Sequence, residues 1–570
     1  MLPDRLISGA ATTALLFLGA CGQAPVYDVI VRGGTIYDGS GAAPVVGDVA
    51  IDGDSVVAVG EIGRATGRTE VDGAGLAVAP GFINMLSWAT ETLIEDGRGL
   101  SDVSQGVTLE VFGEGVSMGP LDAEMKAELE SRQGDITYEV AWTTLGEYLE
   151  YLVERGISPN VASFVGATTV RVHELGYEDR APTEEELARM QDLVREGMRE
   201  GALGVGSSLI YAPAFYADTD ELIALARAAG EFGGIYISHM RSEANRLLES
   251  VDELITIARE AGVPAEIYHL KAAGEPNYDK LSDVFDRVGE ARSGGVRITA
   301  DVYPYTAGAT GLDAAMPPWV QEGGVDAWVE RLRDPEVRRR VAREMRTPTD
   351  EWENLLLLSG SAEDVVLVGF KEDSLKHLTG MSLAEVAERR GLSPEETAMD
   401  LVVKDDSRVG TVYFMMSEEN VRRKLRQPWV SVGSDAGAPA PEGVFLESNP
   451  HPRAYGTFAR ILGRYVREEG VVPLEEGIRR MTSLPAENLS LSRRGRLEAG
   501  YMADVVVFDP ETVIDHATFE EPHQLATGVL HVFVNGVQVL RGGEHTGATP
   551  GRVVRGSGWV GWDDPDREGS

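Results

Sequence analysis

The sequence of 570 residues predicts an α/β protein, a (β/α)8 TIM barrel with a small β-sandwich module built from both chain ends. Eight short apolar segments are each followed by a polar tip, and helical stretches with a period of 3.6 residues separate them. Alternating strand patterns with Gly-Asp turns lie near both ends of the chain. Hydrophobic residues make up 43% of the sequence, which is enough for a large core and excludes wholesale disorder.

The eight predicted barrel strands are identified by the residues near their carboxyl ends. Four consecutive ends, from Ser208 to Asp301, follow one another at intervals of 30 to 32 residues, the length of one strand and helix. Amphipathic segments such as 219–232 and 247–262 fill these intervals. The predicted ends are Ile83, Phe112, Gly166, Ser208, His239, His269, Asp301 and Asp435.

The interval between Asp301 and Asp435 is longer than one strand and helix, which predicts an insertion at about 320–425. Its segment 381–403 has a helical pattern, and we expect it to cover the barrel mouth. The predicted borders are 1–21 for a signal peptide, 22–79 for the first part of the β module, 80–485 for the barrel and 486–570 for the rest of the module and a tail.

The N-terminus predicts a bacterial lipoprotein signal peptide. Arg5 precedes an apolar run, and Leu18-Gly19-Ala20-Cys21 resembles a lipobox in which the only cysteine of the chain stands at the lipidated position. We therefore expect lipidation of Cys21 and a location at the cell envelope, anchored to the membrane on its periplasmic or extracellular face. A single cysteine also excludes intramolecular disulfides.

Net charge restricts the possible partners. The formal charge of −40 argues against nucleic-acid binding, and we predict no protein partner. Outside the signal peptide the sequence has no run of about 18 apolar residues, which argues against a polytopic membrane protein.

Polar residues at the predicted strand ends point to metal chemistry. His239 and His269 end consecutive parallel strands, so both imidazoles can reach one cation. Asp435 ends the last strand, beside the first, where it can accept a proton from water. Glu114 and Glu110 share one face of the second strand, and either could supply a third ligand; Glu114 is nearer the strand end and is our choice.

Motifs along most of the chain, from Tyr27 to about Arg555, resemble the amidohydrolase superfamily, specifically the N-acyl-D-amino-acid deacylase (D-aminoacylase) family. The segments that carry this resemblance include GGIYISHMRSE, IYHLKAAG, TADVYPYTAG, VGSDAGAPAP, HPRAYGTFARILGRYVRE and RGRLEAGYMADVVVFDPETV. It implies a metal-dependent hydrolase that cleaves the amide bond of N-acyl-D-amino acids.

Carried over by position, the resemblance implies roles for individual residues. His239 and His269 match metal ligands, and Asp435 matches the catalytic aspartate that acts as general base. The substrate-binding residues it implies are Lys271, Tyr303, Tyr305 and Arg241.

The chain departs from the family where a His-x-His metal motif is expected after the first strand. Leu86 and Trp88 occupy the two histidine positions and cannot bind metal, and the cysteine ligand of the family is absent. We therefore predict one Zn²⁺ per chain, held by Glu114, His239 and His269 with water as fourth ligand.

Several alternatives stay open. The same site could hydrolyse cyclic amides or dipeptides, and two apolar ligand positions allow a non-catalytic, lipid-anchored binding protein. Lys271 could pair with a neighbouring acid instead of holding substrate. His451 and Arg453 follow the last strand and could be structural or could help to close the site.

Overall fold

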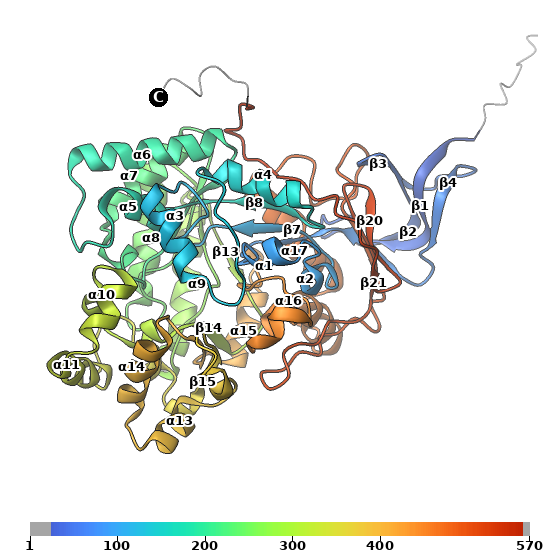
Figure 1. Ribbon diagram of the computed structural model, residues 1–570. Coiled ribbons are helices and arrows are strands. Elements are labelled where there is room, and N and C mark those ends of the chain that lie inside the picture. Colours follow the sequence, from blue (N-terminus) through green and yellow to red (C-terminus); the bar gives the residue numbers. More distant parts are fainter. Residues whose placement is uncertain (1–23, 563–570) are drawn as a thin grey trace, which may run out of the picture.

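The computed structural model describes residues 24–562, so the predicted signal peptide and Cys21 lie outside the described residues. Figure 1 shows a body of strands surrounded by helices and, to one side of it, a sheet that contains β1, β2, β3, β4 and β20.

Eight parallel strand segments form the centre of the body. Two hydrogen-bonded sheets contain them, one with the order β6-β7-β8 and one with the order β9-β10-β11-β12-β13-β17. The segments are β6 (Phe82–Asn84), β7 (Val107–Phe112), β8 (Asn160–Ser163) with its continuation β9 (Val165–Gly166), β10 (Gly204–Ser208), β11 (Ile235–His239), β12 (Ala265–Ile267), β13 (Ile298–Val302) and β17 (Val430–Val432).

Backbone hydrogen bonds connect the two sheets at both places where they meet. Between β8 and β9 the N–H of Phe164 donates to the carbonyl of Phe112 at 2.9 Å. On the other side the N–H of Met85 donates to the carbonyl of Val432 at 3.1 Å. The arrangement is TIM-barrel-like, and each predicted strand end lies within three residues of a strand of this set.

Helices follow most of these strands and cover them from outside. The predicted helix at 219–232 is α7, which begins after Asp218, whose side chain accepts a hydrogen bond from the N–H of Glu221. The helices of the body are α1 (Thr92–Glu95), α2 (Leu100–Val103), α3 (Ala123–Arg132), α4 (Leu145–Arg155), α5 (Ala167–Leu175), α6 (Glu184–Arg199), α7 (Thr219–Gly230), α8 (Leu247–Ala261), α9 (Leu281–Ser293), α15 (Glu418–Leu425), α16 (Arg453–Arg460), α17 (Leu474–Met481) and α18 (Ser483–Asn488).

The first predicted strand is divided between two sheets. Its first half, β5 (Ala77–Pro80), pairs with β1 and β18 in the sheet beside the barrel, and only β6 belongs to the barrel. Gly81 stands between them, where an added Cβ would clash with the side chain of Thr108. A glycine therefore lets the chain pass closely from one sheet to the other.

Both chain ends build the sheet beside the barrel, as their alternating patterns predict. Strand β18 pairs antiparallel with β5, which joins the two ends in one hydrogen-bonded sheet of nine strands. Its order is β21-β20-β19-β18-β5-β1-β2-β3, with β4 beside β1. The remaining bounds are β1 (Val26–Ile36), β2 (Val45–Asp52), β3 (Ser55–Gly60), β4 (Thr66–Asp72), β18 (Val505–Phe508), β19 (Val529–Val534), β20 (Val537–Arg541) and β21 (Glu544–His545).

The last described residues return to the barrel. The N–H of Gly551 donates to Ile157 and that of Val554 to Val161, both at 2.8 Å. Val554 is buried in the apolar cluster that includes side chains of β6 and β7. This segment therefore packs on the barrel, whereas the sequence placed it with the β module.

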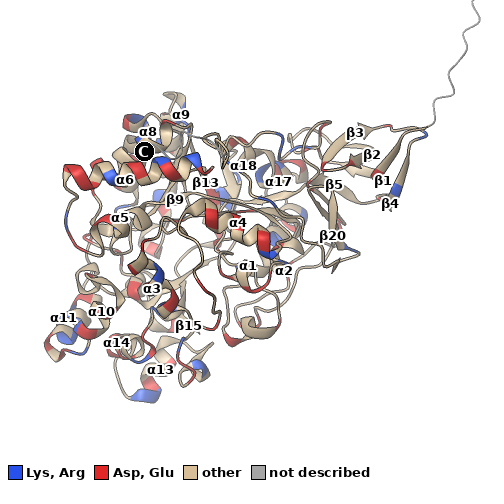
Figure 2. Cartoon of the chain, turned by 45° about the horizontal axis from the view of Figure 1, so that its top comes forward, with Lys and Arg blue, Asp and Glu red and all other residues tan. Residues whose placement is uncertain are grey.

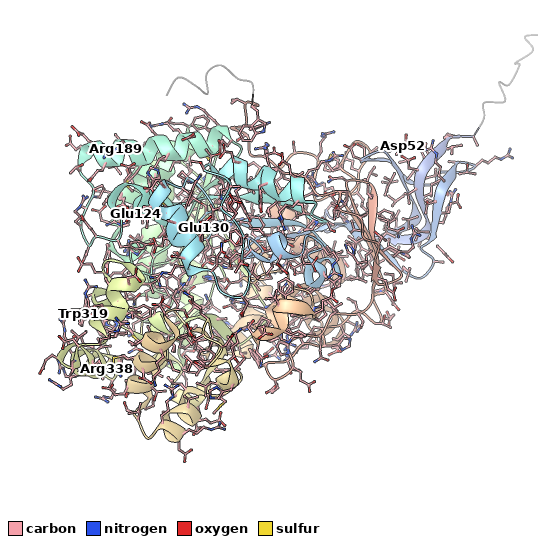
Figure 3. The ribbon with its side chains drawn as sticks, in the orientation of Figure 1. Asp52, Glu124, Glu130, Arg189, Trp319 and Arg338 are labelled. Atoms are coloured by element: carbon pink, nitrogen blue, oxygen red, sulfur yellow. The ribbon has the colours of Figure 1, made fainter. Side chains whose placement is uncertain are left out.

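The insertion is a small unit with its own core. It contains an antiparallel sheet of order β14-β16-β15 and four main helices, and its apolar side chains form a separate cluster. Trp319 and Arg338, labelled in Figure 3, belong to it. Its elements are β14 (Ala307–Gly311), α10 (Gly324–Arg331), α11 (Pro335–Met345), β15 (Val365–Gly369), α13 (Leu383–Arg390), α14 (Pro394–Asp405) and β16 (Gly410–Phe414).

Both borders of the insertion differ from the predicted 320–425. It begins at β14, and α15 belongs to the barrel because Val421 and Leu425 are buried in the barrel cluster. The apolar face of α15 decides this border, and a sequence pattern cannot show which core that face enters.

The outer helices carry acidic and basic side chains close together, as α6 shows in Figure 2. Within residues 24–562, no helix combines the length and the apolar character that crossing a membrane requires.

Candidate active site

A cavity of about 510 Å³ lies at the carboxyl ends of the barrel strands, between the barrel rim and the insertion. The insertion contributes one wall, including Thr310, Val325 and Arg408, but segment 381–403, which the sequence predicts to cover the barrel mouth, supplies none of the lining residues. The charged and ionisable side chains at the barrel end of the cavity are Glu114, His239, Glu243, His269, Lys271, Asp435 and Arg453.

Glu114, His239 and His269 meet at one point of this cavity. Oε1 of Glu114 lies 3.0 Å from Nδ1 of His239 and 2.8 Å from Nε2 of His269. One ligand atom of each residue lies within 4.8 Å of the others, and all three side chains are buried. Two imidazoles and a carboxylate are a typical donor set for a catalytic Zn²⁺ site, so these residues fit a divalent ion.

The backbone around Glu114 explains why this residue reaches the site. It stands between Gly113 and Gly115, both with positive φ, and an added Cβ at Gly113 would lie 2.6 Å from the carbonyl oxygen of Phe164. At Gly115 an added Cβ would clash with the side chain of Ser208. Two glycines thus let the chain turn tightly at the strand end and direct Glu114 inward.

Glu110, the alternative third ligand, lies below the site and does not line the cavity. Its side chain is fully buried, and Oε2 accepts a hydrogen bond of 2.9 Å from Nδ2 of Asn84. The same amide nitrogen donates to Asp102 at 3.2 Å. Burial raises the pKa of both carboxyl groups, so they form a buried polar network beneath the cavity.

Charge in the cluster favours an ionised Glu114. Burial raises the pKa of this carboxyl, but the attraction and hydrogen bonds of His269 and His239 outweigh that effect and hold it well below its usual range. Glu114 is therefore an anion, the form that binds a metal ion.

His269 and Asp435 adopt backbone conformations that non-glycine residues rarely use. Their φ angles are 34° and 52°, in the left-handed region. Such conformations cost about 1–3 kcal/mol each and are concentrated at functional sites. Two hydrogen bonds hold them here: the N–H of His269 donates to Oδ1 of Asp301 at 2.9 Å, and that of Asp435 to the carbonyl of Leu86 at 2.8 Å.

Both carboxylate oxygens of Asp435 have a partner. Oδ2 lies 2.7 Å from Nη1 of Arg453, and Oδ1 accepts a hydrogen bond of 3.1 Å from the indole N–H of Trp88. Burial raises the pKa of Asp435 above its usual value, although Arg453 lowers it. A buried carboxylate with a raised pKa, beside a metal-binding cluster, is suited to accept and return a proton.

Lys271 lines the cavity and also pairs with an acid. Its Nζ lies 2.8 Å from both carboxylate oxygens of Glu243 and 2.7 Å from Nδ1 of His269. Glu243 counteracts the effect of burial and keeps the pKa of Lys271 above its usual value. The acid pairing weighed from sequence is present, and the ammonium group still borders the cavity.

Of the predicted substrate-binding residues, Tyr303 lines the cavity, whereas Tyr305 and Arg241 do not. The hydroxyl of Tyr305 points to the carbonyl of Pro452 at 3.4 Å. The guanidinium of Arg241 lies 2.9 Å from Glu253 of α8 and borders a second cavity. These partners turn both side chains away from the metal cluster.

His451 has a structural role that also positions Arg453. Its Nε2 lies 2.9 Å from the carbonyl of Ala307, and its Nδ1 accepts the N–H of Arg453 at 3.0 Å. This pattern fixes the neutral tautomer with the proton on Nε2. Burial and Arg453 lower the pKa of His451 well below its usual value, in agreement with a neutral ring.

Two functional candidates were missed in the sequence. Glu243 follows His239 by four residues, and its Oε2 lies 3.4 Å from Nε2 of that histidine. This spacing was the available signal. Arg408 comes from the insertion, far from every barrel motif, and the sequence offered no signal for it.

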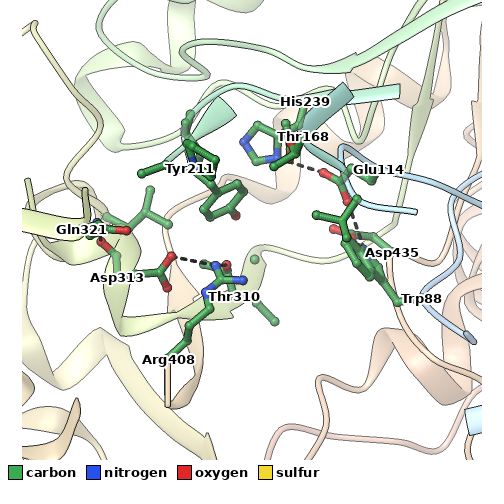
Figure 4. A pocket seen from close by; sticks show the side chains of 18 of the residues that line it. Trp88, Glu114, Thr168, Tyr211, His239, Thr310, Asp313, Gln321, Arg408 and Asp435 are labelled. Carbon is green, nitrogen blue, oxygen red and sulfur yellow. Dashed lines mark hydrogen bonds and ion pairs between the residues drawn. The ribbon is translucent and has the colours of Figure 1, made fainter. Parts of the chain in front are cut away.

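The far end of the cavity combines one ion pair with apolar side chains. Nη2 of Arg408 lies 2.8 Å from Asp313 and donates to the hydroxyl of Thr310 at 3.1 Å. Figure 4 shows this group facing Glu114 and Asp435 across the cavity. The apolar side chains nearby come from α10 and α12 (Leu355–Leu358) and include Val325, Trp328 and Leu355.

Comparisons with known proteins agree with this geometry. A model of the amidohydrolase family matches residues 69–540. The D-aminoacylase of Alcaligenes xylosoxydans xylosoxydans is 35% identical over 530 residues, which cover 93% of this chain and 97% of that protein.

Two solved structures are similar over almost the whole chain. One is a D-aminoacylase studied for its binuclear metal centre, with a TM-score of 0.76 and 32% identity, covering 93% of this chain and 100% of the other. The second is the N-acyl-D-glutamate deacylase of Bordetella bronchiseptica with zinc and a phosphonate inhibitor, with a TM-score of 0.76 and 30% identity. It covers 93% of this chain and 99% of its own.

Proposed function

Because this chain belongs to the amidohydrolase family, we propose that it hydrolyses the amide bond of N-acyl-D-amino acids. One observation carries the proposal: Glu114, His239 and His269 converge in a cavity that Asp435 also borders. The relatives named above act on substrates of this class.

The cofactor of the proposed reaction is one Zn²⁺ per chain, held by Glu114, His239 and His269. When bound, such an ion polarises a carbonyl and lowers the pKa of water. Glu114 is ionised, as metal binding requires, whereas His269, whose pKa Glu243 and Glu114 raise, would release its proton when the ion binds.

Asp435 performs the proton transfers in this mechanism. It accepts a proton from the attacking water while the water oxygen bonds to the amide carbon. It then returns that proton to the amine nitrogen as the C–N bond breaks, which yields a carboxylic acid and a free amino acid. Trp88 and Arg453 hold its two oxygens and thereby orient the carboxylate.

Lys271 and Arg453 bind the substrate carboxylate in this proposal. Both cations border the cavity, and Tyr303 lies between them, with the guanidinium of Arg453 4.6 Å from the centre of its ring. A charge-assisted hydrogen bond from either cation would orient the amide bond toward Glu114 and Asp435.

The proposal extends to architecture and location. We propose that the eight parallel strands act as one closed barrel, supported by the hydrogen bond from Met85 to Val432, and that the nine-stranded sheet folds as a sandwich.

We further propose a lipid anchor on Cys21 at the cell envelope. Cys21→Ser should release the protein from membranes, and a wild type that is already soluble with an intact N-terminus would contradict the anchor.

A paired substrate and metal assay tests the function. Purified protein is assayed with N-acetyl-D- and N-acetyl-L-amino acids, and zinc is measured on the same preparation, with Asp435→Asn as control. We expect turnover of D-substrates by zinc-loaded wild type only. A protein without metal that zinc cannot activate would instead favour a binding protein.

A further inference from the structure

Trp88 lies between the two carboxylates that matter most for the proposed reaction. Its indole N–H donates to Oε2 of Glu114 at 3.0 Å and to Oδ1 of Asp435 at 3.1 Å. Figure 4 shows the indole beside both carboxylates.

The main chain fixes Trp88 at this point. Its N–H donates to the carbonyl of Ala436, next to Asp435, at 2.9 Å. The N–H of the preceding Ser87 donates to the carbonyl of Val111, close to Glu114, also at 2.9 Å. The chain at Trp88 thus continues the direction of β6 between β7 and β17, the strands that Glu114 and Asp435 follow. These backbone hydrogen bonds place the indole between the two carboxylates.

The position between two converging carboxylates is one that a cation would ordinarily occupy. Two anions this close repel each other, and Glu114 is one of the groups that raise the pKa of Asp435. An indole N–H can donate to both oxygens, but it has no lone pair for a metal and no charge to lose.

We propose that Trp88 takes the place of a second metal ion: its N–H bridges Glu114 and Asp435, positions both, and limits the site to one ion. This inference rests on the proposed metal site at Glu114, His239 and His269. Trp88 is a positioning residue here, because it acts through the two carboxylates.

The contacts of each carboxylate show what this bridge does. Glu114 directs Oε1 to the two histidines and Oε2 to Trp88, so only one of its oxygens remains for an ion. Asp435 has one oxygen on Trp88 and the other near Arg453, which prevents the carboxylate from rotating away. Removal of the indole N–H releases one oxygen of each acid.

Substitution at this position is practical because the indole faces the cavity. Trp88 is 40% exposed, so a smaller side chain leaves no void in the apolar core. Trp319 offers a matched control in the insertion, since its indole N–H also donates to a carboxylate, Oε2 of Glu344 at 2.7 Å, outside the catalytic cavity.

The test measures zinc stoichiometry by equilibrium dialysis together with kcat and KM. Wild type should saturate at one ion per chain, whereas Trp88→His, which adds an imidazole beside Glu114 and Asp435, should take up a second. Trp88→Phe should retain one ion and lose about 10-fold in kcat, with KM changed less than kcat. Trp319→Phe should match wild type in both measurements.

Four outcomes would contradict the proposed role of Trp88 or the proposal on which it rests. Two ions bound per wild-type chain would overturn the role of Trp88 and leave the proposed hydrolysis intact. A Trp88→Phe variant with unchanged kcat and zinc affinity would overturn the positioning role, and a Trp88→His variant that still saturates at one ion would overturn the exclusion of a second. A wild type that binds no zinc would instead contradict the proposed function itself, and this inference with it.

Discussion

The two ends of the candidate active-site cavity differ in how their side chains are held. At the barrel end, the charged groups interlock through short contacts, and Glu114, His269 and Lys271 are 5%, 3% and 4% exposed. At the insertion end, one ion pair between Arg408 and Asp313 stands among apolar side chains, and the Arg408 side chain is 50% exposed.

This difference indicates that the barrel end of the cavity carries out the reaction and that the insertion end selects the substrate. Barrel strands fix their ends rigidly through the sheet, so groups that need accurate mutual geometry belong there. The core of the insertion consists mostly of its own side chains and meets the barrel only at loop residues such as Ala244 and Tyr303, so the insertion is suited to discriminate between substrates. Four predictions follow this division, from the barrel end outward.

The largest effect is expected from the three proposed metal ligands. His239→Ala, His269→Ala or Glu114→Ala should remove zinc and reduce kcat/KM by about 10³-fold or more, because metal polarisation contributes several kcal/mol to the transition state. Zinc content and activity are measured on the same preparations. Normal zinc content in Glu114→Ala would assign the third ligand to another carboxylate of the cavity, such as Glu243, whose Oε2 lies 3.4 Å from Nε2 of His239.

Asp435→Asn keeps the shape of the side chain and removes the base. We expect kcat to fall about 10²- to 10⁴-fold while zinc stays bound. In wild type, activity should decline as the pH falls through the raised pKa of Asp435, because protonation removes the base. A variant that loses zinc along with activity would assign Asp435 to metal binding instead.

Lys271→Met tests whether the ammonium group of Lys271 binds the substrate carboxylate. KM for substrates with a free carboxylate should rise about 10- to 100-fold, while amidated analogues should change little. Since the variant leaves Glu243 buried without its partner, Lys271→Met/Glu243→Gln serves as the control for stability. An unchanged KM with lost zinc would contradict the substrate role.

The smallest effect is expected at the insertion end. Asp313→Asn frees Arg408 from its ion pair and should lower KM for N-acyl-D-glutamate about 2- to 5-fold, the size of a partly exposed charge interaction. Substrates with apolar side chains should be unaffected, and Arg408→Met should abolish the gain. If KM changed equally for N-acyl-D-glutamate and for substrates with apolar side chains, the ion pair would have no role in substrate selectivity.

The sequence by itself determined the order of strands and three of the central residues. The period of the βα units placed His239 and His269 at strand ends, and the apolar segment before Asp435 identified the last strand. Parallel strands bring such ends to one rim, whatever the length of the connections between them. The alternating patterns near both ends of the chain likewise predicted one shared sheet, because each pattern has an apolar face to bury. The nine-stranded sheet contains strands from both ends.

Only the tertiary structure decided which nearby side chains enter the cavity. Glu114 and Glu110 share a face of one strand, but the turn at Gly113 and Gly115 directs the first inward while Asn84 holds the second below. Glu253 likewise draws Arg241 away. Beyond a strand end, a side chain follows its loop backbone and its partners from distant segments, and neither can be read from spacing along the chain.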